Sequence, residues 1–191
     1  MTTSILGPSE VTLDAGLDPG PDADSALEQL YAAHWRRLVR LAVLLLHDQG
    51  AAEEVVQDAF VAMHGRWRSL RDPDKALAYL RQSVVNRSRS ALRHRGVVER
   101  YVARQSPVVL NDDPADLPAL ATDRRTAVLD ALRTLPTRQR EVLALRHYLE
   151  LSEAEIAETL GISRGSVKAH ASRGSAALRL LLADRLDQGE L

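Results

Sequence analysis

The sequence contains no cysteine, which excludes structural disulfides, thiolate nucleophiles and cysteine-rich zinc sites and fits a reducing compartment. Long apolar runs are also missing. The longest is LAVLLL at residues 41–46, far short of the ~20 apolar residues that a membrane-spanning helix needs. Near the N-terminus, no basic residue precedes an apolar segment as it does in a secretory signal. We therefore expect a cytoplasmic protein that does not insert into a membrane.

Signs of catalysis are equally scarce. The chain has no glycine-rich phosphate loop, and no nucleophilic side chain lies near a plausible base. The histidines do not have the spacing of metal ligands: they lie at positions 34, 47, 64, 94, 147 and 170. The sequence therefore predicts a protein that is not an enzyme and that holds no metal and no cofactor.

The net charge of -1 is the sum of unlike parts. Residues 1–24 carry five acidic residues and no basic one, whereas residues 25–100 carry thirteen basic and eight acidic residues. The first segment also mixes its acids with glycine and proline, which favours a disordered tail. An acidic tail beside a basic region is typical of a protein that meets a polyanion.

Apolar residues recur at helical spacing along most of the chain, and no segment alternates convincingly as a strand would. We expect an all-α fold, in which an N-terminal helical bundle and a C-terminal helix-turn-helix domain are joined by a flexible linker. Loss of periodicity and the positions of the prolines set the boundaries. They are a disordered acidic tail at 1–24, a helical domain at 25–95, a linker at 96–120, a second helical domain at 121–183 and a tail at 184–191.

The stretch SEAEIAETLGISRGSVKAHASRG, residues 152–174, predicts two helices joined by a short turn. Ser152 followed three residues later by Glu155 is a capping box that begins the first helix. Gly161 can adopt the left-handed conformation that ends it, and Ser163 can cap the next helix. This arrangement is a helix-turn-helix.

The second of these helices has one apolar side and one side of small and cationic residues. Its inward residues are predicted to be Val167, Ala171, Gly174 and Leu178. Its outward residues are Gly165, Ala169, Ser172, Arg173 and Ala176, with Lys168 on the flank. Small residues let a helix lie close to a groove floor, while Lys and Arg reach phosphates or guanine edges. A solvated surface helix is the alternative, but the capping box, the turn and the absence of acids from 161 to 179 together favour DNA binding.

The predicted helix at 75–95 carries a polar stripe opposite its apolar side. Its members are Tyr79, Gln82, Asn86, Arg89 and Arg93, spaced by three or four residues. Asn and Gln can hydrogen-bond base edges, Tyr can stack on an unpaired base, and Arg can hold phosphate. The stripe could also be a solvated face, but a second nucleic-acid candidate on the same chain favours a nucleic-acid partner.

The predicted helix at 51–67 has a different outer face. It presents Glu54, Asp58 and Val61, with Glu53 and Gln57 at the sides. An acidic face with an exposed valine is a poor surface for DNA. It is better suited to docking a basic protein partner.

Three segments in this order resemble bacterial sigma factors of the extracytoplasmic-function group, within the sigma-70 family. They are AAEEVVQDAFVAMHGRW at 51–67, AYLRQSVVNRSRSALR at 78–93 and the segment from LPTRQREVL to SAALR at 135–179. The resemblance implies that the chain binds core RNA polymerase and directs transcription initiation at promoters. It implies that Glu53, Glu54, Gln57 and Asp58 lie in the segment that docks on polymerase. An anti-sigma factor is a further candidate partner.

The resemblance also implies two kinds of promoter contact. The minus-ten element is captured as single-stranded DNA by the segment that holds the stripe from Tyr79 to Arg93, and Asn86 aligns with a family asparagine that receives a flipped base. The minus-thirty-five element is read as duplex by Arg164, Gly165, Ser166, Lys168, Ala169 and Arg173. Ala169 and His170 replace the serine and arginine that are common in the family, so the sequence read there is expected to differ.

Two other kinds of protein would also account for parts of the pattern. SVKAH, residues 166–170, resembles the helix-turn-helix of quorum-sensing regulators as well, but these usually carry an α/β domain in front, whereas the front half here reads as helical. A helical adaptor that binds only protein would use the acidic face alone.

Overall fold

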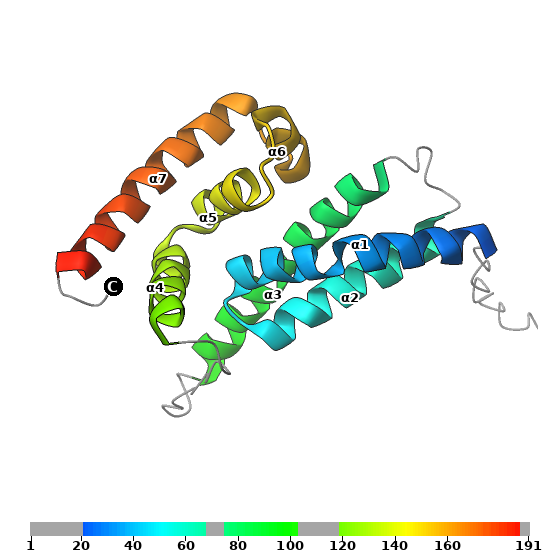
Figure 1. The fold of residues 1–191 in the computed structure, drawn as a ribbon, viewed down its shortest axis with the longest axis horizontal. Coiled ribbons are helices and arrows are strands. Elements are labelled where there is room, and N and C mark those ends of the chain that lie inside the picture. The colour runs from blue at the N-terminus through cyan, green and yellow to red at the C-terminus, as the bar shows by residue number, and fades with distance from the viewer. Residues whose placement is uncertain (1–20, 68–74, 103–118, 188–191) are drawn as a thin grey trace, which may run out of the picture.

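The computed structural model describes the backbone of residues 21–67, 75–102 and 119–187, and the side chains of 24–67, 75–96 and 126–183. Within these ranges the regular structure is entirely helical, which confirms the predicted all-α class (Figure 1). In chain order the elements are α1 (Pro21–Leu46), α2 (Gln49–Arg66), α3 (Ala76–Val102), α4 (Ala119–Thr134), α5 (Thr137–Leu143), the π-helical turn η3 (Ala144–Tyr148), α6 (Glu153–Leu160) and α7 (Arg164–Asp187).

Several helix boundaries differ from the predicted ones, three of them by about a helical turn or more. Helix α1 begins at Pro21 rather than at residue 25, where the helical domain is predicted to begin, because proline has a preset φ and suits a first helical turn. Helix α3 continues past residue 95 to Val102, since a lone glycine at 96 weakens a helix without ending it. Helix α7 continues to Asp187. Residues 1–20 of the predicted tail, 103–118 of the predicted linker and 188–191 lie outside the described residues.

Helices α1, α2 and α3 pack on one another as the N-terminal bundle. The predicted inner face of α2 is buried, since Val56, Ala59, Phe60 and Met63 are all in the core. The α1–α2 corner is tight. His47 takes a left-handed φ of 56°, and Asp48 caps α2 by accepting a hydrogen bond from the Ala51 amide at 2.8 Å. This bond, followed by the Arg95 guanidinium, lowers the pKa of Asp48.

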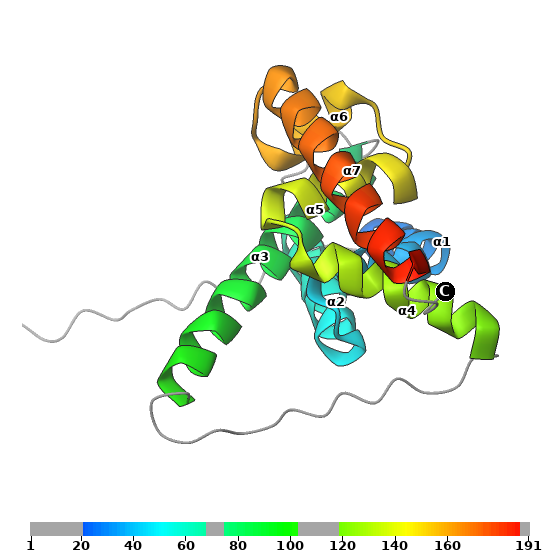
Figure 2. The ribbon, with the colours of Figure 1, turned by 90° about the vertical axis from the view of Figure 1, so that its left-hand side faces the viewer.

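Helices α4 to α7 and the η3 turn form the C-terminal half, in which α7 lies on the outside, away from the N-terminal bundle (Figures 1 and 2). Helix α7 crosses α5 closely at Gly174. A Cβ atom added there would lie 3.1 Å from Leu143 Cδ1 and 3.2 Å from Gln139 Cβ. Glycine at this position therefore lets the two helix backbones approach one another.

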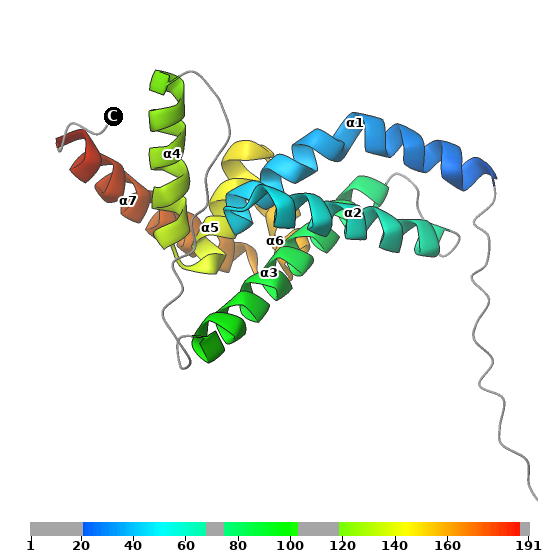
Figure 3. The ribbon, with the colours of Figure 1, turned by 90° about the horizontal axis from the view of Figure 1, so that it is seen from below.

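The two halves pack together, although the sequence predicts only a tether between them. Helices α1 and α3 contact η3 and α6, and a single cluster of buried residues runs from Leu41 and Leu80 to Leu145 and Ile156. Figures 1 and 3 both show α5 and α6 beside the N-terminal bundle. The two domains that the sequence predicts as separate thus share one continuous core in this structure.

A partly buried polar pair also crosses this boundary. The guanidinium Nη1 of Arg140, on α5, lies 3.1 Å from Nε2 of His47 at the end of α1. Arg140 is 6% exposed and always a donor, so the His47 nitrogen must accept. Burial first, then the charges of Arg140 and Arg133, lower the pKa of His47 to about 4. His47 is therefore held neutral.

Candidate nucleic-acid interface

The helix-turn-helix forms as the sequence predicts. Ser152 Oγ accepts from the Glu155 amide at 3.3 Å, and the Ser152 amide donates to Glu155 Oε2 at 2.9 Å, so both halves of the capping box are present. Gly161 ends α6 with a φ of 64°. Ser163 then caps α7 by accepting from the Ser166 amide at 3.1 Å. These local bonds fix the angle at which α7 leaves the turn.

The outer face of α7 holds most of the predicted minus-thirty-five residues. Val167 and Ala171 are buried beneath it, as predicted. Arg164, Gly165, Lys168, Ala169, Ser172 and Arg173 are exposed. Ser166 is only half-buried, and its hydroxyl lies 2.9 Å from the Ser163 hydroxyl. The face has small residues in its middle and cations at its edges, which is the shape that a helix needs to enter a major groove.

Lys168 has one acidic neighbour. Its Nζ lies 3.7 Å from Glu153 Oε2 at the beginning of α6, and the lysine side chain is 68% exposed. An ion pair this exposed contributes little free energy. The lysine can therefore exchange this carboxylate for a DNA phosphate at small cost.

The five residues of the stripe on α3 are not equally exposed. Gln82, Asn86 and Arg93 face solvent. Tyr79 packs partly against the core, and the Arg89 side chain is only 24% exposed. The sequence predicts all five side chains on one outward face, but the ring of Tyr79 and the guanidinium of Arg89 are partly covered by other parts of the chain.

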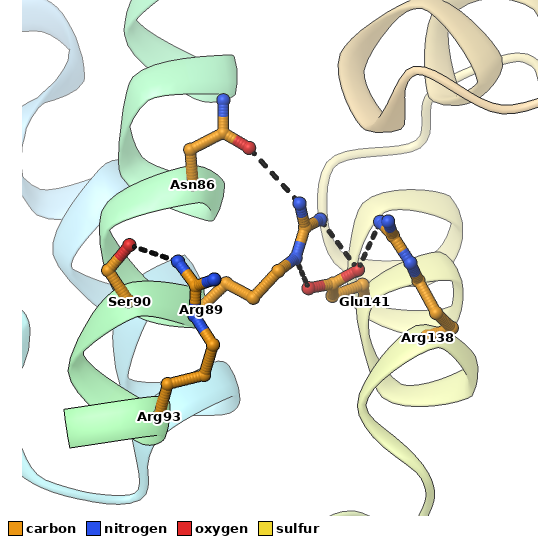
Figure 4. Close-up of polar contacts among 6 residues, drawn as sticks. All are labelled: Asn86, Arg89, Ser90, Arg93, Arg138 and Glu141. Atoms are coloured by element: carbon orange, nitrogen blue, oxygen red, sulfur yellow. Dashed lines mark hydrogen bonds and ion pairs between the residues drawn. The ribbon is translucent and has the colours of Figure 1, made fainter. Parts of the chain in front are cut away.

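Glu141 of α5 covers Arg89 (Figure 4). Arg89 donates from Nε to Glu141 Oε1 at 2.9 Å and from Nη2 to Oε2 at 3.0 Å. Arg138 adds a bond to Oε2 at 3.1 Å. The remaining Arg89 nitrogen, Nη1, donates to Asn86 Oδ1 at 3.2 Å. Two stripe residues are thus engaged in a network that reaches into the C-terminal half.

Sequence reasoning missed Glu141 as a partner of the stripe. A signal was available, because Glu141 lies one helical turn before Leu145, which is fully buried, and residues four apart share a helix face. An acid on an inner face needs a buried cation. Which cation it meets depends on how the two halves pack.

The predicted polymerase-docking face lies on the outside of α2. Glu53, Glu54, Gln57 and Asp58 are all exposed, and Val61 is 66% exposed beside them. Two carboxylates have partners: Glu53 Oε1 accepts from Gln49 Nε2, and Asp58 Oδ2 lies 3.0 Å from Arg87 Nη1 of α3. The face keeps its acidic character, and its valine remains open to contact.

Other kinds of site are not evident in the described part of the chain. No group of three or more histidine and carboxylate side chains converges there as metal ligands would. None of the described helices is long and apolar enough to cross a bilayer.

Comparison with known proteins identifies both halves. Residues 30–97 match the family described as Sigma-70 region 2, and residues 125–178 match the one described as Sigma-70, region 4. These regions define a DNA-recognition subunit of the transcription machinery. The chain belongs to the sigma-70 family of RNA polymerase sigma factors, in the extracytoplasmic-function group, and is a promoter-directing sigma factor. The match over 30–97 disfavours a quorum-sensing regulator.

Several relatives match over most of their length. The RNA polymerase sigma-E factor of Streptomyces avermitilis is 35% identical over 148 residues, which cover 78% of this chain and 80% of that protein. The ECF RNA polymerase sigma factor SigM of Mycobacterium tuberculosis is 30% identical over 159 residues, which cover 82% of this chain and 77% of that protein.

Solved structures share the fold. The sigma factor RpoE, in complex with the anti-sigma factor NepR from Bartonella quintana, has a TM-score of 0.67 at 24% identity and covers 86% of this chain and 98% of its own. CnrH, in complex with the cytosolic domain of CnrY, has a TM-score of 0.64 at 26% identity, and the match covers 85% of this chain and 95% of CnrH.

Proposed function

We propose that this sigma factor docks on core RNA polymerase through α2, captures the melted minus-ten element with α3 and reads the minus-thirty-five duplex with α7. The observation that carries the proposal is the pairing of the two family matches with exposed faces of suitable chemistry. The α2 face is acidic, whereas the α3 and α7 faces offer amides and cations. The protein itself catalyses no reaction, holds no cofactor, and acts in the cytoplasm with polymerase.

Each residue at the minus-ten site has a distinct role in the proposal. The carboxamide of Asn86 hydrogen-bonds a flipped base, and that of Gln82 contacts a neighbouring base edge. The Tyr79 ring, half covered by the core, stacks on an unpaired base with its open side. Arg89 and Arg93 hold the phosphates of the single strand.

At the minus-thirty-five site, α7 enters the major groove with Gly165 and Ala169 at its closest approach. Lys168 and Arg173 reach phosphates or guanine edges, and Arg164 and Ser166 contact the backbone at the beginning of the helix. With an alanine at 169 and a half-buried His170 beside it, recognition relies more on the flanking cations than on hydrogen bonds from the helix centre.

A protein partner of the anti-sigma kind is also part of the proposal. CnrH, which is 26% identical, was solved in complex with the cytosolic domain of CnrY. A comparable partner would cover the surfaces that polymerase and promoter need. The test is whether a partner protein co-purifies with the chain alone but not with the chain bound to polymerase.

Transcription by reconstituted polymerase tests the promoter contacts. Asn86→Ala is expected to weaken promoter recognition by about 1 to 3 kcal/mol while polymerase binding stays intact. Gln29→Ala, which removes an exposed amide on α1, is the matched control and should transcribe normally. Normal transcription by Asn86→Ala would show that the flipped-base assignment is wrong.

Affinity for core polymerase tests the docking face separately. Reversing both charges, with Glu54→Lys and Asp58→Lys, should abolish binding, because like charges then meet across the interface. The pair Glu28→Lys and Glu158→Lys changes the net charge equally at exposed positions outside α2 and should leave binding unchanged. Equal affinity of the two double variants would rule out α2 as the docking face.

A further inference from the structure

A pocket lies where the two halves of the chain meet, and its volume is about 190 Å³. Helices α1 and α3 line it on one side, and the loop between η3 and α6 lines it on the other. Its walls are apolar at four leucines, which are Leu38, Leu77, Leu149 and Leu151. An apolar cavity of about 150 Å³ holds benzene. The pocket therefore has room for one ring, or a short aliphatic chain, together with a small polar group.

The loop that lines the pocket has an uncommon backbone conformation. Glu150 takes a left-handed φ of 58°, which residues other than glycine seldom adopt unless their surroundings hold them there. The Leu149 amide donates to the Ala144 carbonyl at 3.3 Å. The Leu151 amide donates to the Leu145 carbonyl at 3.1 Å. The turn places both leucines on the wall of the pocket, while the Glu150 side chain remains exposed.

The polar part of the lining consists of basic side chains. They are His34 and Arg37 on α1 and Arg81 on α3. Arg37 Nη2 donates to the Leu149 carbonyl at 3.2 Å, and Arg81 Nε donates to the Leu77 carbonyl at 3.3 Å. Because a guanidinium has five N–H donors, these bonds use only a small part of what the two arginines offer. Among the residues that the structure describes, no carboxylate lies within ion-pair distance of either guanidinium.

Glu155 is an acidic neighbour of this lining. The hydrogen bonds from Ser152 lower the pKa of Glu155, and the charge of Arg81 lowers it further. The Glu155 carboxylate accepts from the Ser152 amide at 2.9 Å and from the Ser152 hydroxyl at 2.7 Å, so it serves the capping box of α6. The positive charge of Arg81 at the pocket is therefore reduced by Glu155 but not neutralised through a direct contact.

We propose that this pocket binds a small organic anion, a carboxylate that carries an aromatic ring or a short aliphatic chain. The apolar part lies among the four leucines. The carboxylate accepts hydrogen bonds from Arg37 and Arg81, because the guanidinium fork matches a planar carboxylate. An inorganic anion would use the arginines but leave the leucines without an apolar partner. Neither polymerase nor DNA takes part, so the proposal does not depend on the proposed function.

A ligand in this pocket would link its own binding to the association of the two halves. Arg37 and Arg81 belong to the N-terminal bundle, whereas Leu149 and Leu151 belong to the C-terminal half. Because only the packed arrangement brings these residues together, the anion binds that arrangement and stabilises it by mass action. By reciprocity, any change that joins the halves more firmly also strengthens binding of the anion.

Titration of the free, full-length protein with benzoate at constant ionic strength tests the proposal. The NMR shifts of the leucine methyl groups report binding, and we expect one saturable site with a Kd of about 1 mM or tighter, as the size of the ligand allows. The thermal unfolding midpoint should rise with benzoate concentration. Benzamide has the same shape without the charge, and phosphate has the charge without the ring. Each should bind about tenfold more weakly than benzoate.

Four variants locate the site. Arg37→Gln and Arg81→Gln each remove one cation from the lining and should weaken benzoate binding about tenfold. Arg36→Gln is the matched control, because Arg36 is exposed on α1 and does not line the pocket. It should bind benzoate as the wild type does. Leu151→Trp keeps both arginines but fills the pocket with its ring, so it should lose benzoate binding.

Three results would overturn the proposal. The first is no saturable binding of benzoate at about 10 mM, well above the expected Kd. The second is equal affinity of benzoate for Arg36→Gln and for both lining variants, since the arginines of the pocket would then not hold the carboxylate. The third is unchanged binding to Leu151→Trp, which would place benzoate elsewhere. Transcription with core polymerase in the absence of benzoate tests the proposed function separately, so the two can fail independently.

Discussion

His47 should make the stability of this protein fall as the medium becomes mildly acidic. Burial first, then Arg140 and Arg133, lower the pKa of His47 from 6.5 to about 4 in the folded chain. In the unfolded chain the imidazole titrates near its ordinary value. Between these two pKa values the unfolded state binds a proton that the folded state does not bind, so the free energy of unfolding decreases as pH falls.

The magnitude follows from the shift. From pH 6.5 to pH 5 the free energy of unfolding falls by about 1.36 kcal/mol per pH unit, which gives a loss of about 2 kcal/mol at pH 5. Above pH 6.5 both states hold a neutral imidazole, and the effect vanishes. The full stability is therefore present at neutral pH and is lost as pH falls toward the folded pKa.

Urea denaturation at pH 7.5 and at pH 5, followed by circular dichroism, measures this loss. Carboxylates also titrate in the range, so the wild-type chain is compared with His47→Asn. Asparagine tolerates the left-handed φ of 56° but does not titrate. The wild type should lose about 2 kcal/mol more than the variant. Equal losses in the two proteins would refute the burial of a neutral imidazole against Arg140.

Two further substitutions test the construction of the helix-turn-helix. Ser152→Ala removes the capping box of α6 and should lower the free energy of unfolding by about 1 kcal/mol. Ser172→Ala, on the exposed face of α7, is the control and should not lower it. Equal thermal unfolding midpoints for the two variants would contradict a stabilising cap at Ser152. Gly174→Val places methyl groups where even a Cβ would lie 3.1 Å from Leu143 and should cost about 1 to 3 kcal/mol. Gly165→Val, in the same helix with only Ser163 Oγ at 3.8 Å, is its control, and similar denaturation midpoints would show that α5 and α7 do not need glycine at 174.

Local features of the fold could be predicted because neighbouring residues determine them. The capping box at Ser152, the left-handed Gly161 and the buried side of α7 all follow from spacing within one or two turns. The same holds for the inner face of α2. Where a helix begins or ends is harder to predict, since α3 continues beyond residue 95 to Val102 through positions with no strong stop signal.

Contacts between the two halves could not be predicted, because they pair residues far apart in the sequence. Arg89 and Glu141 are 52 positions apart, and nothing near either residue specifies the other. Arg140 and His47 are 93 positions apart. The sequence therefore predicts which residues of α3 are polar but not which of them the C-terminal half covers, and for this reason Arg89 is less exposed than expected.

The central claim is that this chain gives core RNA polymerase the ability to find promoters. Its most direct test is transcription from a library of randomised promoters with purified core polymerase and this protein as the only sigma factor. The account predicts RNA chains that begin at a defined distance from two shared sequence elements. Asn86→Ala should weaken selection of the minus-ten element, whereas Glu54→Lys/Asp58→Lys should abolish these transcripts. Polymerase that starts no RNA above the level of core enzyme alone would contradict it.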